Sequence, residues 1–357
     1  MNTIVLTGGG TAGHVTPNIA LIPYLNGYEI HYCGEEGGIE QQMLTRYPQV
    51  IFHPLPCIKF SRSLSPKNLS VPFILGSGIR KAKKLFAEIN PKVVFSKGGY
   101  AALPAAMAAA KKKIPLVIHE SDTSMGLSNR LVARKCRHVC ASYPQVADSY
   151  PNGFLTGAIL RRELYFGKKE NVIKKFGMPQ NGKPNLLVFG GSIGAVAINK
   201  ALESALHEIC TYFNVLHISG KHDYTGGEPN YRRLEFCDCM QDCYAWADII
   251  VCRAGANTLC EVTALRKPAL VIPLPKSKSS RGDQVLNAQY YADLGAIKIL
   301  PQEKLTCGEL VTSTLSLYRD RTSYIAAMEK APSPDGTRKI ASLLNSFNVN
   351  SLPTPTE

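Results

Sequence analysis

The sequence lacks any long uninterrupted apolar run. No stretch approaches the roughly 18 to 20 apolar residues that a membrane-spanning helix needs. Its first residues, Met-Asn-Thr-Ile-Val-Leu-Thr, also lack the basic segment that precedes the apolar core of a secretion signal. We therefore expect a protein of the cytosol that has neither a membrane span nor a cleaved leader.

The cysteines lack the spacings of disulfide frameworks and metal sites. There are 11 of them, but a long chain without a secretion signal belongs in a reducing compartment, where thiols stay free. The densest group, Cys237, Cys239 and Cys243, contains no Cys-x-x-Cys pair and has no His-x-x-x-His partner nearby. We expect these thiols to pack as ordinary core side chains, and we expect no metal site.

Acidic residues are too few to balance the basic ones. The formal net charge of +14 favours an acidic partner, which could be nucleic acid, an anionic bilayer surface or a phosphorylated substrate. The basic residues are spread out, with short clusters at 80–84, 111–113 and 134–137, and no signature of an RNA- or DNA-binding module is present. We therefore expect no nucleic-acid partner.

The sequence predicts two α/β halves. With 357 residues and 45% hydrophobic composition it can bury a large core, and its length favours two domains. In both halves short apolar runs alternate with amphipathic segments, which is typical of parallel strands joined by crossover helices. A region rich in glycine, proline and charge, 143–183, separates the halves, and we place the linker at 157–162. The predicted strands are 3–7, 29–33, 93–96, 116–119, 185–189, 215–218, 249–251 and 269–272.

A glycine-rich loop follows the first predicted strand of each half. Residues 8–14 read Gly-Gly-Gly-Thr-Ala-Gly-His before a helical segment at 17–25, and residues 190–195 read Gly-Gly-Ser-Ile-Gly-Ala before another helical segment. Such loops let a phosphate or sugar approach the backbone and the positive end of the next helix. The first loop also fits Gly-x-Gly-x-x-Gly, with Glu35 placed as a ribose-binding acid, so an NAD-dependent oxidoreductase remains an alternative.

Two further loops follow predicted strands. Residues 97–100 (Lys-Gly-Gly-Tyr) come after the strand at 93–96, at a carboxyl end where open α/β sheets bind ligands. After the strand at 249–251, a turn of small residues leads into a helix whose first turn we expect to carry Thr258 and Glu261. Glu261 either caps this helix or accepts both ribose hydroxyls of a nucleotide.

Five motifs, in this order, resemble those of the MurG family of bacterial glycosyltransferases. They are 7–14, 98–100, 190–195, 245–248 (Ala-Trp-Ala-Asp) and 253–258 (Arg-Ala-Gly-Ala-Asn-Thr). The resemblance implies an α/β GT-B fold, in which two Rossmann-like domains face each other across a cleft. It implies a lipid-acceptor domain at 1–157, a UDP-sugar domain at 158–330, and, at 331–357, a helix that returns to the first domain followed by a loose tail.

The same resemblance implies an inverting transferase of peptidoglycan synthesis. Such an enzyme moves N-acetylglucosamine from UDP-N-acetylglucosamine to an undecaprenyl-diphosphate-linked muramyl peptide, converting lipid I to lipid II. The expected location is peripheral, on the cytoplasmic face of an anionic membrane. The shared fold leaves a second alternative open, an enzyme like the UDP-N-acetylglucosamine 2-epimerases, which would need no lipid acceptor.

Motif by motif, the resemblance assigns roles to particular residues. Ser192 and Arg161 would contact the diphosphate, the backbone of Cys237 the uracil, and Gln284 the amino sugar. His14 matches the histidine proposed near the reacting centre. The loop around His14 is Thr11, Ala12 and Gly13, and the contacts to phosphate, sugar and ribose fall on Ala256, Asn257, Thr258, Leu259, Cys260 and Glu261.

The chain departs from the family pattern at three places. Asp122 stands where the family often has an asparagine that touches the sugar, although its carboxylate can still accept a sugar hydroxyl. Residues 158–160 (Ala-Ile-Leu) replace the common Asn-Pro-Val before Arg161. The second glutamine that usually adjoins Gln284 is absent.

Glycosyl transfer needs a stabilised leaving diphosphate and an activated hydroxyl. No Asp-x-Asp pair is present to hold a divalent cation, so helix N-termini and Arg161 are expected to stabilise the diphosphate, without cofactor or metal. His14 suits the general base, although it could instead only cover the glycine loop. His119 and Glu120 form a second candidate pair for the base, and His119 could equally be a core residue.

Residues 68–90 place apolar side chains beside Arg80, Lys81, Lys83 and Lys84. Periodicity alone slightly favours an amphipathic helix that faces the core. The family resemblance favours a surface that lies on anionic lipid.

Overall fold

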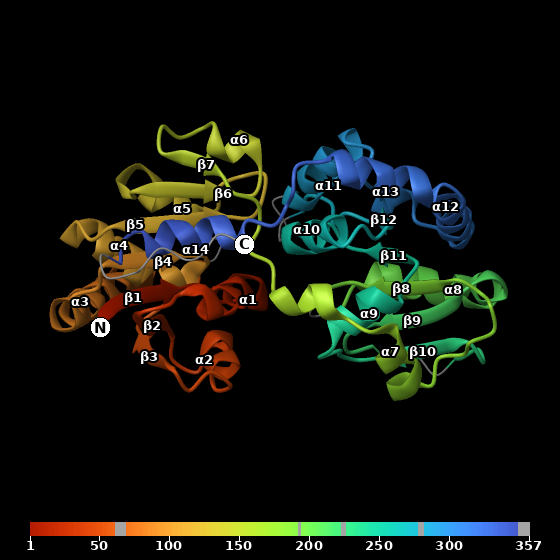
Figure 1. Cartoon of the computed structure of the whole chain (residues 1–357), viewed down its shortest axis with the longest axis horizontal. Coiled ribbons are helices and arrows are strands. Elements are labelled where there is room, and N and C mark those ends of the chain that lie inside the picture. The colour runs from red at the N-terminus through yellow and green to blue at the C-terminus, as the bar shows by residue number, and fades with distance from the viewer. Residues whose placement is uncertain (61–68, 192–193, 223–225, 278–281, 349–357) are drawn as a thin grey trace. The chain divides into compact units, whose positions relative to one another are not determined.

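The computed structural model describes residues 1–60, 69–191, 194–222, 226–277 and 282–348. The chain forms two compact units (Figure 1). The first unit runs to Arg161 and also takes in the segment that begins at Asp335, and the second unit comprises Arg162–Pro334. Each unit is a parallel sheet with helices packed against it.

The first unit contains a sheet of seven parallel strands in the order β3-β2-β1-β4-β5-β6-β7. The strands are β1 (Asn2–Thr7), β2 (Tyr28–Glu35), β3 (Val50–Leu55), β4 (Val93–Ser96), β5 (Leu116–Glu120), β6 (His138–Ala141) and β7 (Gly153–Leu155). The helices are α1 (Ala12–Leu21), α2 (Ile39–Leu44), α3 (Val71–Ile89), α4 (Leu103–Lys112), α5 (Leu127–Val132), α6 (Pro144–Ala147) and α14 (Thr337–Asn345).

The second unit contains six parallel strands in the order β10-β9-β8-β11-β12-β13. The strands are β8 (Asn185–Phe189), β9 (Asn214–Ile218), β10 (Tyr231–Leu234), β11 (Ile249–Cys252), β12 (Ala269–Val271) and β13 (Lys298–Ile299). The helices are α7 (Lys169–Phe176), α8 (Val196–Tyr212), α9 (Met240–Trp246), α10 (Ala256–Ala264), α11 (Asp283–Asp293), α12 (Cys307–Arg319) and α13 (Arg321–Lys330).

Both sheets reverse their strand order once. In the first sheet β1 lies beside β4, and the chain leaves these two strands towards opposite edges. In the second sheet β8 and β11 have the same relation. Open α/β sheets bind ligands outside the carboxyl ends of the strands at such a switch point, because the loops that leave the two strands diverge there. The fold therefore marks one candidate crevice in each unit.

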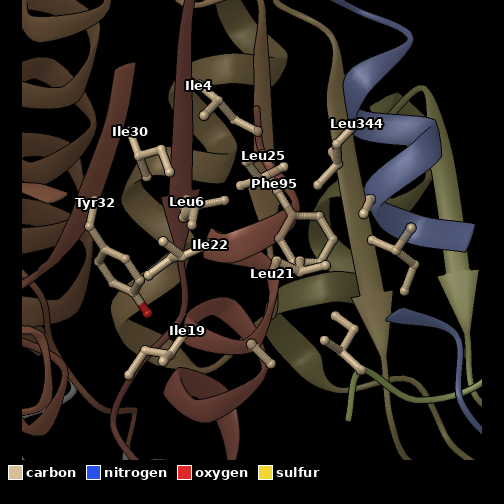
Figure 2. Close-up of a cluster of buried hydrophobic side chains, with 14 of the residues drawn as sticks. Ile4, Leu6, Ile19, Leu21, Ile22, Leu25, Ile30, Tyr32, Phe95 and Leu344 are labelled. Atoms are coloured by element: carbon tan, nitrogen blue, oxygen red, sulfur yellow. The ribbon is translucent and has the colours of Figure 1, made fainter. Parts of the chain in front are cut away.

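The C-terminal helix completes the core of the first unit. Ile340, Ala341 and Leu344 of α14 are buried in the same apolar cluster as β1, β2 and α1, and Figure 2 shows Leu344 among these side chains. Polar contacts hold the returning chain in place, among them a reciprocal pair between Thr337 and Leu160. The Thr337 hydroxyl accepts a hydrogen bond from the Leu160 backbone N–H at 2.8 Å and lies 3.0 Å from the Leu160 carbonyl oxygen, to which it donates.

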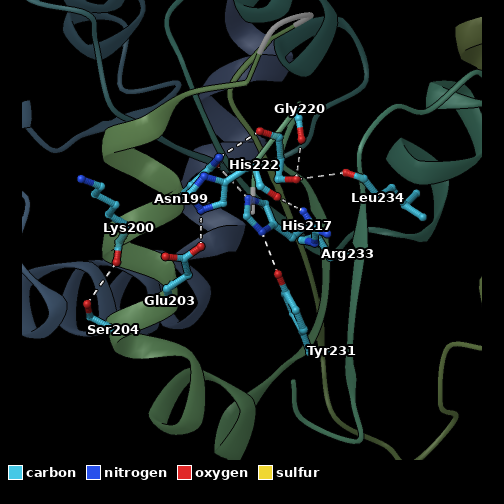
Figure 3. Close-up of polar contacts among 11 residues, drawn as sticks. Asn199, Lys200, Glu203, Ser204, His217, Gly220, His222, Tyr231, Arg233 and Leu234 are labelled. Atoms are coloured by element: carbon cyan, nitrogen blue, oxygen red, sulfur yellow. Dashed lines mark hydrogen bonds and ion pairs between the residues drawn. The ribbon is translucent and has the colours of Figure 1, made fainter. Parts of the chain in front are cut away.

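A buried polar network supports the second sheet (Figure 3). Asn199 on α8 donates its amide N–H to the Ser219 carbonyl, which leaves its side-chain oxygen 3.1 Å from Nε2 of His217. Because that oxygen can only accept, Nε2 of His217 carries the proton and Nδ1 accepts from the Tyr231 hydroxyl at 2.9 Å. Burial is the main reason why the pKa of His217 falls to about 3, so the ring stays neutral. The network fixes α8 against the carboxyl end of β9.

Candidate functional site

The two glycine loops of the first unit meet at the β1/β4 switch point. The Gly9 N–H donates to the Gly98 carbonyl at 3.4 Å. A Cβ atom at Gly99 would lie only 2.2 Å from the Gly9 carbonyl oxygen, and one at Gly10 would lie 2.4 Å from the Tyr100 ring. Gly10, Gly98 and Gly99 also adopt positive φ values of 81°, 88° and 85°. Glycine is required at these positions both by the close approach and by the backbone conformation.

His14 lies two residues into α1, beside these loops. Its Nδ1 atom is 2.9 Å from the Thr11 hydroxyl oxygen, and its backbone N–H donates to the Thr11 carbonyl at 3.1 Å. A Cβ atom at Gly99 would lie 3.2 Å from the same Nδ1 atom. Thr11 and Gly13 are exposed, whereas Ala12 and His14 are half-buried. The motif therefore holds an imidazole ring at the mouth of the β1/β4 crevice.

A buried carboxyl group, which the sequence patterns did not single out, organises the first loop. Glu40 on α2 is completely buried and accepts hydrogen bonds from the backbone N–H groups of Gly10 and Glu35, at 3.2 and 2.8 Å. A Cβ atom at Gly9 would lie 2.4 Å from its carboxyl carbon. Glu40 thus uses the Gly10 N–H of the loop within the protein itself. Glu35 in turn accepts a hydrogen bond from the Tyr100 hydroxyl.

His119 and Glu120, the second candidate pair for the base, are built into the core. His119 is completely buried, its Nε2 atom lies 2.9 Å from the Gly157 carbonyl, and burial lowers its pKa well below the usual value. Glu120 accepts hydrogen bonds from the backbone N–H groups of Ser121, Asp122 and Gly126 and from the Asn129 amide. Its carboxyl group therefore shapes the loop that carries Asp122, which is half-buried.

Arg161 is the last residue of the first unit's N-terminal segment. Its side chain is half-buried, and its Nε atom has no hydrogen-bond partner among the residues that the structure describes. A buried guanidinium N–H without an acceptor is costly unless a ligand supplies one.

In the second unit the glycine loop of residues 190–195 follows β8. Ser192 and Ile193 lie outside the described residues. Around them, Gly191 and Gly194 have φ values of 100° and 79°, and a Cβ atom at Gly194 would lie 2.1 Å from the Ser219 carbonyl oxygen. The loop is therefore packed directly against the end of β9, and α8 starts immediately after it.

Helix α10 begins at Ala256, directly after β11, at the β8/β11 switch point. Leu259 and Cys260 are fully buried, and the Leu259 N–H already donates to the Gly255 carbonyl at 3.0 Å. Asn257 and Thr258 are half-buried in the first turn. Glu261 is the sixth residue of the helix, so the expectation that it lies in the first turn was wrong. The helix begins at Ala256, earlier than the run of small residues suggested, so Glu261 lies in its second turn.

Glu261 is held in place by Tyr244 on α9. The Tyr244 hydroxyl donates to Oε2 of Glu261 at 2.7 Å, and the Tyr244 ring packs edge-on against Phe189 at the end of β8. Glu261 itself is half-buried. Tyr244 thus positions the proposed ribose ligand, a role that the Ala-Trp-Ala-Asp motif beside it did not reveal.

Gln284 lies on α11, and Cys237 follows β10. The side-chain oxygen of Gln284, on α11, accepts the Leu274 backbone N–H at 2.9 Å, which leaves its amide N–H groups as donors. Asn287 of the same helix donates to the Ala254 carbonyl at 3.5 Å and so ties α11 to the turn before α10. Cys237 is buried, and hydrogen bonding from Cys243 is the main cause that lowers its pKa to about 6.

Comparison with known proteins identifies both units. The glycosyltransferase family 28 N-terminal domain matches residues 4–141, and the glycosyltransferase family 28 C-terminal domain matches residues 185–344. The UDP-N-acetylglucosamine--N-acetylmuramyl-(pentapeptide) pyrophosphoryl-undecaprenol N-acetylglucosamine transferase of Lachnospira eligens is 42% identical over 352 residues, which cover 96% of this chain and 99% of that protein.

Solved structures agree on the fold. The crystal structure of Acinetobacter baumannii MurG superposes with a TM-score of 0.74 at 25% identity and covers 97% of this chain and 100% of that one. The UDP-GlcNAc 2-epimerase from Neisseria meningitidis reaches 0.66 at 16% identity, covering 98% and 100%, and therefore shares the fold alone. The two parallel α/β units are thus the GT-B fold, as predicted. With both family domains matched and such identity over almost its whole length, the chain belongs to glycosyltransferase family 28, among the MurG enzymes.

Proposed function

We propose that the protein transfers N-acetylglucosamine from UDP-N-acetylglucosamine to the undecaprenyl-diphosphate-linked muramyl peptide of peptidoglycan synthesis, with inversion at the anomeric carbon. The observation that carries this proposal is the position of four of the five family motifs. Residues 7–14 and 98–100 lie at the β1/β4 switch point, and residues 190–195 and 253–258 lie at the β8/β11 switch point. Both units thus offer glycine-rich backbone where a nucleotide or a phosphorylated acceptor can approach.

The second unit supplies the groups for the donor. Glu261 accepts the ribose hydroxyls, the backbone at Cys237 meets the uracil, and Gln284 donates its amide N–H groups to the sugar. The N-terminal amides of α10 and the segment at Ser192 meet the diphosphate, and Arg161, the residue directly before the second unit, supplies a positive charge to the leaving group. The contacts to the diphosphate are the ones that become stronger as negative charge develops on the departing UDP.

The first unit supplies the base. With Nδ1–H of His14 donating to the Thr11 hydroxyl, Nε2 presents a lone pair and accepts the proton of the acceptor hydroxyl. As that proton leaves, the hydroxyl oxygen bonds to the anomeric carbon, and the bond to the UDP oxygen breaks on the opposite face. The core positions of His119 and Glu120 favour His14 for this role.

The test of the proposed function is incubation with radiolabelled UDP-N-acetylglucosamine, followed by lipid extraction. We expect label in the lipid fraction only when the polyprenyl-linked muramyl peptide is added. Conversion of the sugar nucleotide to its epimer without any acceptor would instead favour the epimerase alternative and would overturn the proposal.

Replacing His14 should affect the chemical step rather than donor binding. We expect His14→Ala to lower turnover by roughly 100-fold or more, the usual range for loss of a general base, with the affinity for UDP nearly unchanged. Thr11→Val, which removes the hydroxyl that orients Nδ1, should give a smaller loss in the same transfer assay. Loss of UDP binding in calorimetry, together with preserved turnover at saturating donor, would show that His14 is a binding residue.

Replacing Glu261 should weaken donor binding. Glu261→Ala loses two charge-assisted hydrogen bonds to the ribose, each worth roughly 1.5 to 3 kcal/mol, so the donor KM should rise strongly while the unfolding transition is retained. Tyr244→Phe should raise the donor KM less, because the Glu261 carboxylate remains but loses the hydroxyl that orients it. Glu208→Ala, at an exposed position on α8, is the matched control. An unchanged donor KM in Glu261→Ala would refute the assignment.

We also propose that α3 brings the first unit to the lipid surface. Its second half packs Ile79, Ala82 and Phe86 into the core, which is the arrangement that periodicity favoured. Its first half differs, because Phe73 is 80% exposed, and Leu69, just before the helix, is 78% exposed. Exposed Arg80, Lys81 and Lys84 follow on the same helix. No helix in the described part of the chain has the length and hydropathy to cross a bilayer, so insertion of these side chains would be interfacial.

Membrane binding should therefore respond to both salt and apolar substitution. We expect salt to release the protein from anionic vesicles, because surface charges are screened beyond about 8 Å at physiological ionic strength. Phe73→Ser should reduce vesicle binding in a sedimentation assay at every salt concentration. Phe166→Ser, an exposed phenylalanine of the second unit, should leave it unchanged. Equal binding to neutral and anionic vesicles at all salt concentrations would contradict the electrostatic part of the proposal.

A further inference from the structure

Three cysteine thiols of the second unit converge although their linear spacing predicts no site. The Sγ atom of Cys237 lies 3.6 Å from that of Cys239 and 3.4 Å from that of Cys243, and all three sulfurs lie within 4.8 Å of one another. Cys237 follows β10, Cys239 immediately precedes α9, and Cys243 lies one helical turn further on. The start of α9 folds the Cys-x-Cys-x-x-x-Cys segment back on itself and so replaces the usual Cys-x-x-Cys turn.

We propose that Cys237, Cys239 and Cys243 form a three-thiolate site for Zn²⁺. Zinc binds thiolate sulfur at about 2.3 Å, so three sulfurs on a tetrahedral ion are separated by roughly 3.8 Å. The two Sγ separations from Cys237 are slightly shorter than that value and the third is no more than 4.8 Å, so the ligands need only small side-chain movements to close on the ion. Thiolates select zinc over magnesium or calcium, which prefer oxygen ligands.

The surroundings suit a bound ion. Three thiolates and one Zn²⁺ carry a net charge of −1, and Lys175 on α7 places its ammonium 3.6 Å from the Cys239 sulfur. Lys175 is itself fixed by Asp238 at 2.9 Å. Cys237 and Cys243 are buried, whereas Cys239 is only half-buried and gives the ion a path from solvent. The Lys175 ammonium therefore offsets the negative charge of the site, and Cys239 gives the ion an entry path.

The fourth coordination position is left to water or another small exogenous ligand. Asp242, the acidic residue next to Cys243, is already engaged, because its two carboxylate oxygens accept the Lys168 backbone N–H at 2.7 Å and the Asn171 amide at 3.0 Å. The site therefore differs from a closed four-cysteine structural site. A bound ion would fix the start of α9. Cys243 immediately precedes Tyr244, the residue that positions Glu261.

The test is metal binding by the whole reduced protein after treatment with a chelator. We expect one equivalent of Co²⁺ to give the intense visible bands of a tetrahedral ion and a thiolate-to-metal charge-transfer band, and Zn²⁺ to displace it. Cys239→Ser should weaken Zn²⁺ binding in calorimetry by roughly tenfold or more. Cys307→Ser, a half-buried cysteine of the same unit, is the matched control and should bind as the wild type does. Zn²⁺ should raise the Tm of the wild type and of this control, because it binds only the folded state.

A second measurement keeps the proposal testable if Cys239→Ser does not fold. In the wild-type protein, Zn²⁺ should protect Cys237, Cys239 and Cys243 from alkylation, as read by mass spectrometry, while Cys307 remains equally reactive with and without the metal. Absence of the charge-transfer band, equal Zn²⁺ affinity in Cys239→Ser and Cys307→Ser, or unchanged alkylation of the three cysteines would each overturn the proposal.

Discussion

The reversal of strand order beside the first strand of each sheet determines where this molecule can hold ligands. Parallel strands place their carboxyl ends at one edge, and the reversal makes neighbouring loops diverge there. In both units the chain fills that point with glycines whose Cβ atoms would collide with a neighbouring loop or strand end. The close approach leaves backbone N–H groups and helix starts near the opening. His14 in one unit and Glu261 in the other are placed by helices that begin at these points.

Two buried carboxyl groups, those of Glu40 and Glu120, organise loops by accepting backbone N–H groups, as a bound anion would. Glu40 accepts backbone N–H groups from the loop after β1 and from the end of β2, and Glu120 accepts three from the loop after β5. Each organises irregular backbone that would otherwise leave amides unpaired away from water. For Glu40 the consequence reaches the glycine loop itself, because its carboxyl group accepts the Gly10 N–H and packs against Gly9.

The sequence predicts most of the strands that are buried on both faces, because these are continuous apolar runs, but it misses the inner strand β6, which begins with His138. The strands at 93–96 and 185–189 have the predicted bounds. It does not predict β3, which contains His53 and Pro54, or β10, which reads Tyr-Arg-Arg-Leu, because edge strands need not be apolar. Helix α1 begins at Ala12, earlier than its Pro17 suggested, since a helix can start before a proline that its first turns tolerate.

The candidate site, like the strands, has parts that the sequence predicts and parts that it does not. Glycine motifs and the residues inside them are visible in sequence because backbone conformation restricts which residue can occupy them. Tyr244 and Glu40 are not visible, because their roles depend on contacts with Glu261 and Gly10 that only the fold creates. The convergence of Cys237, Cys239 and Cys243 depends on the same kind of information, namely how α9 begins. The roles of His14, Arg161 and Gln284 in the reaction stay predictions.

The hydrogen bonds between Thr337 and Leu160 have a consequence for how the chain is made. They close the first unit with a segment that leaves the ribosome after the second unit, which is continuous between Arg162 and Pro334. During synthesis the second unit can therefore become complete first, while the apolar positions that Ile340 and Leu344 later cover remain open on the N-terminal part. The part of the protein that is translated first thus finishes folding last.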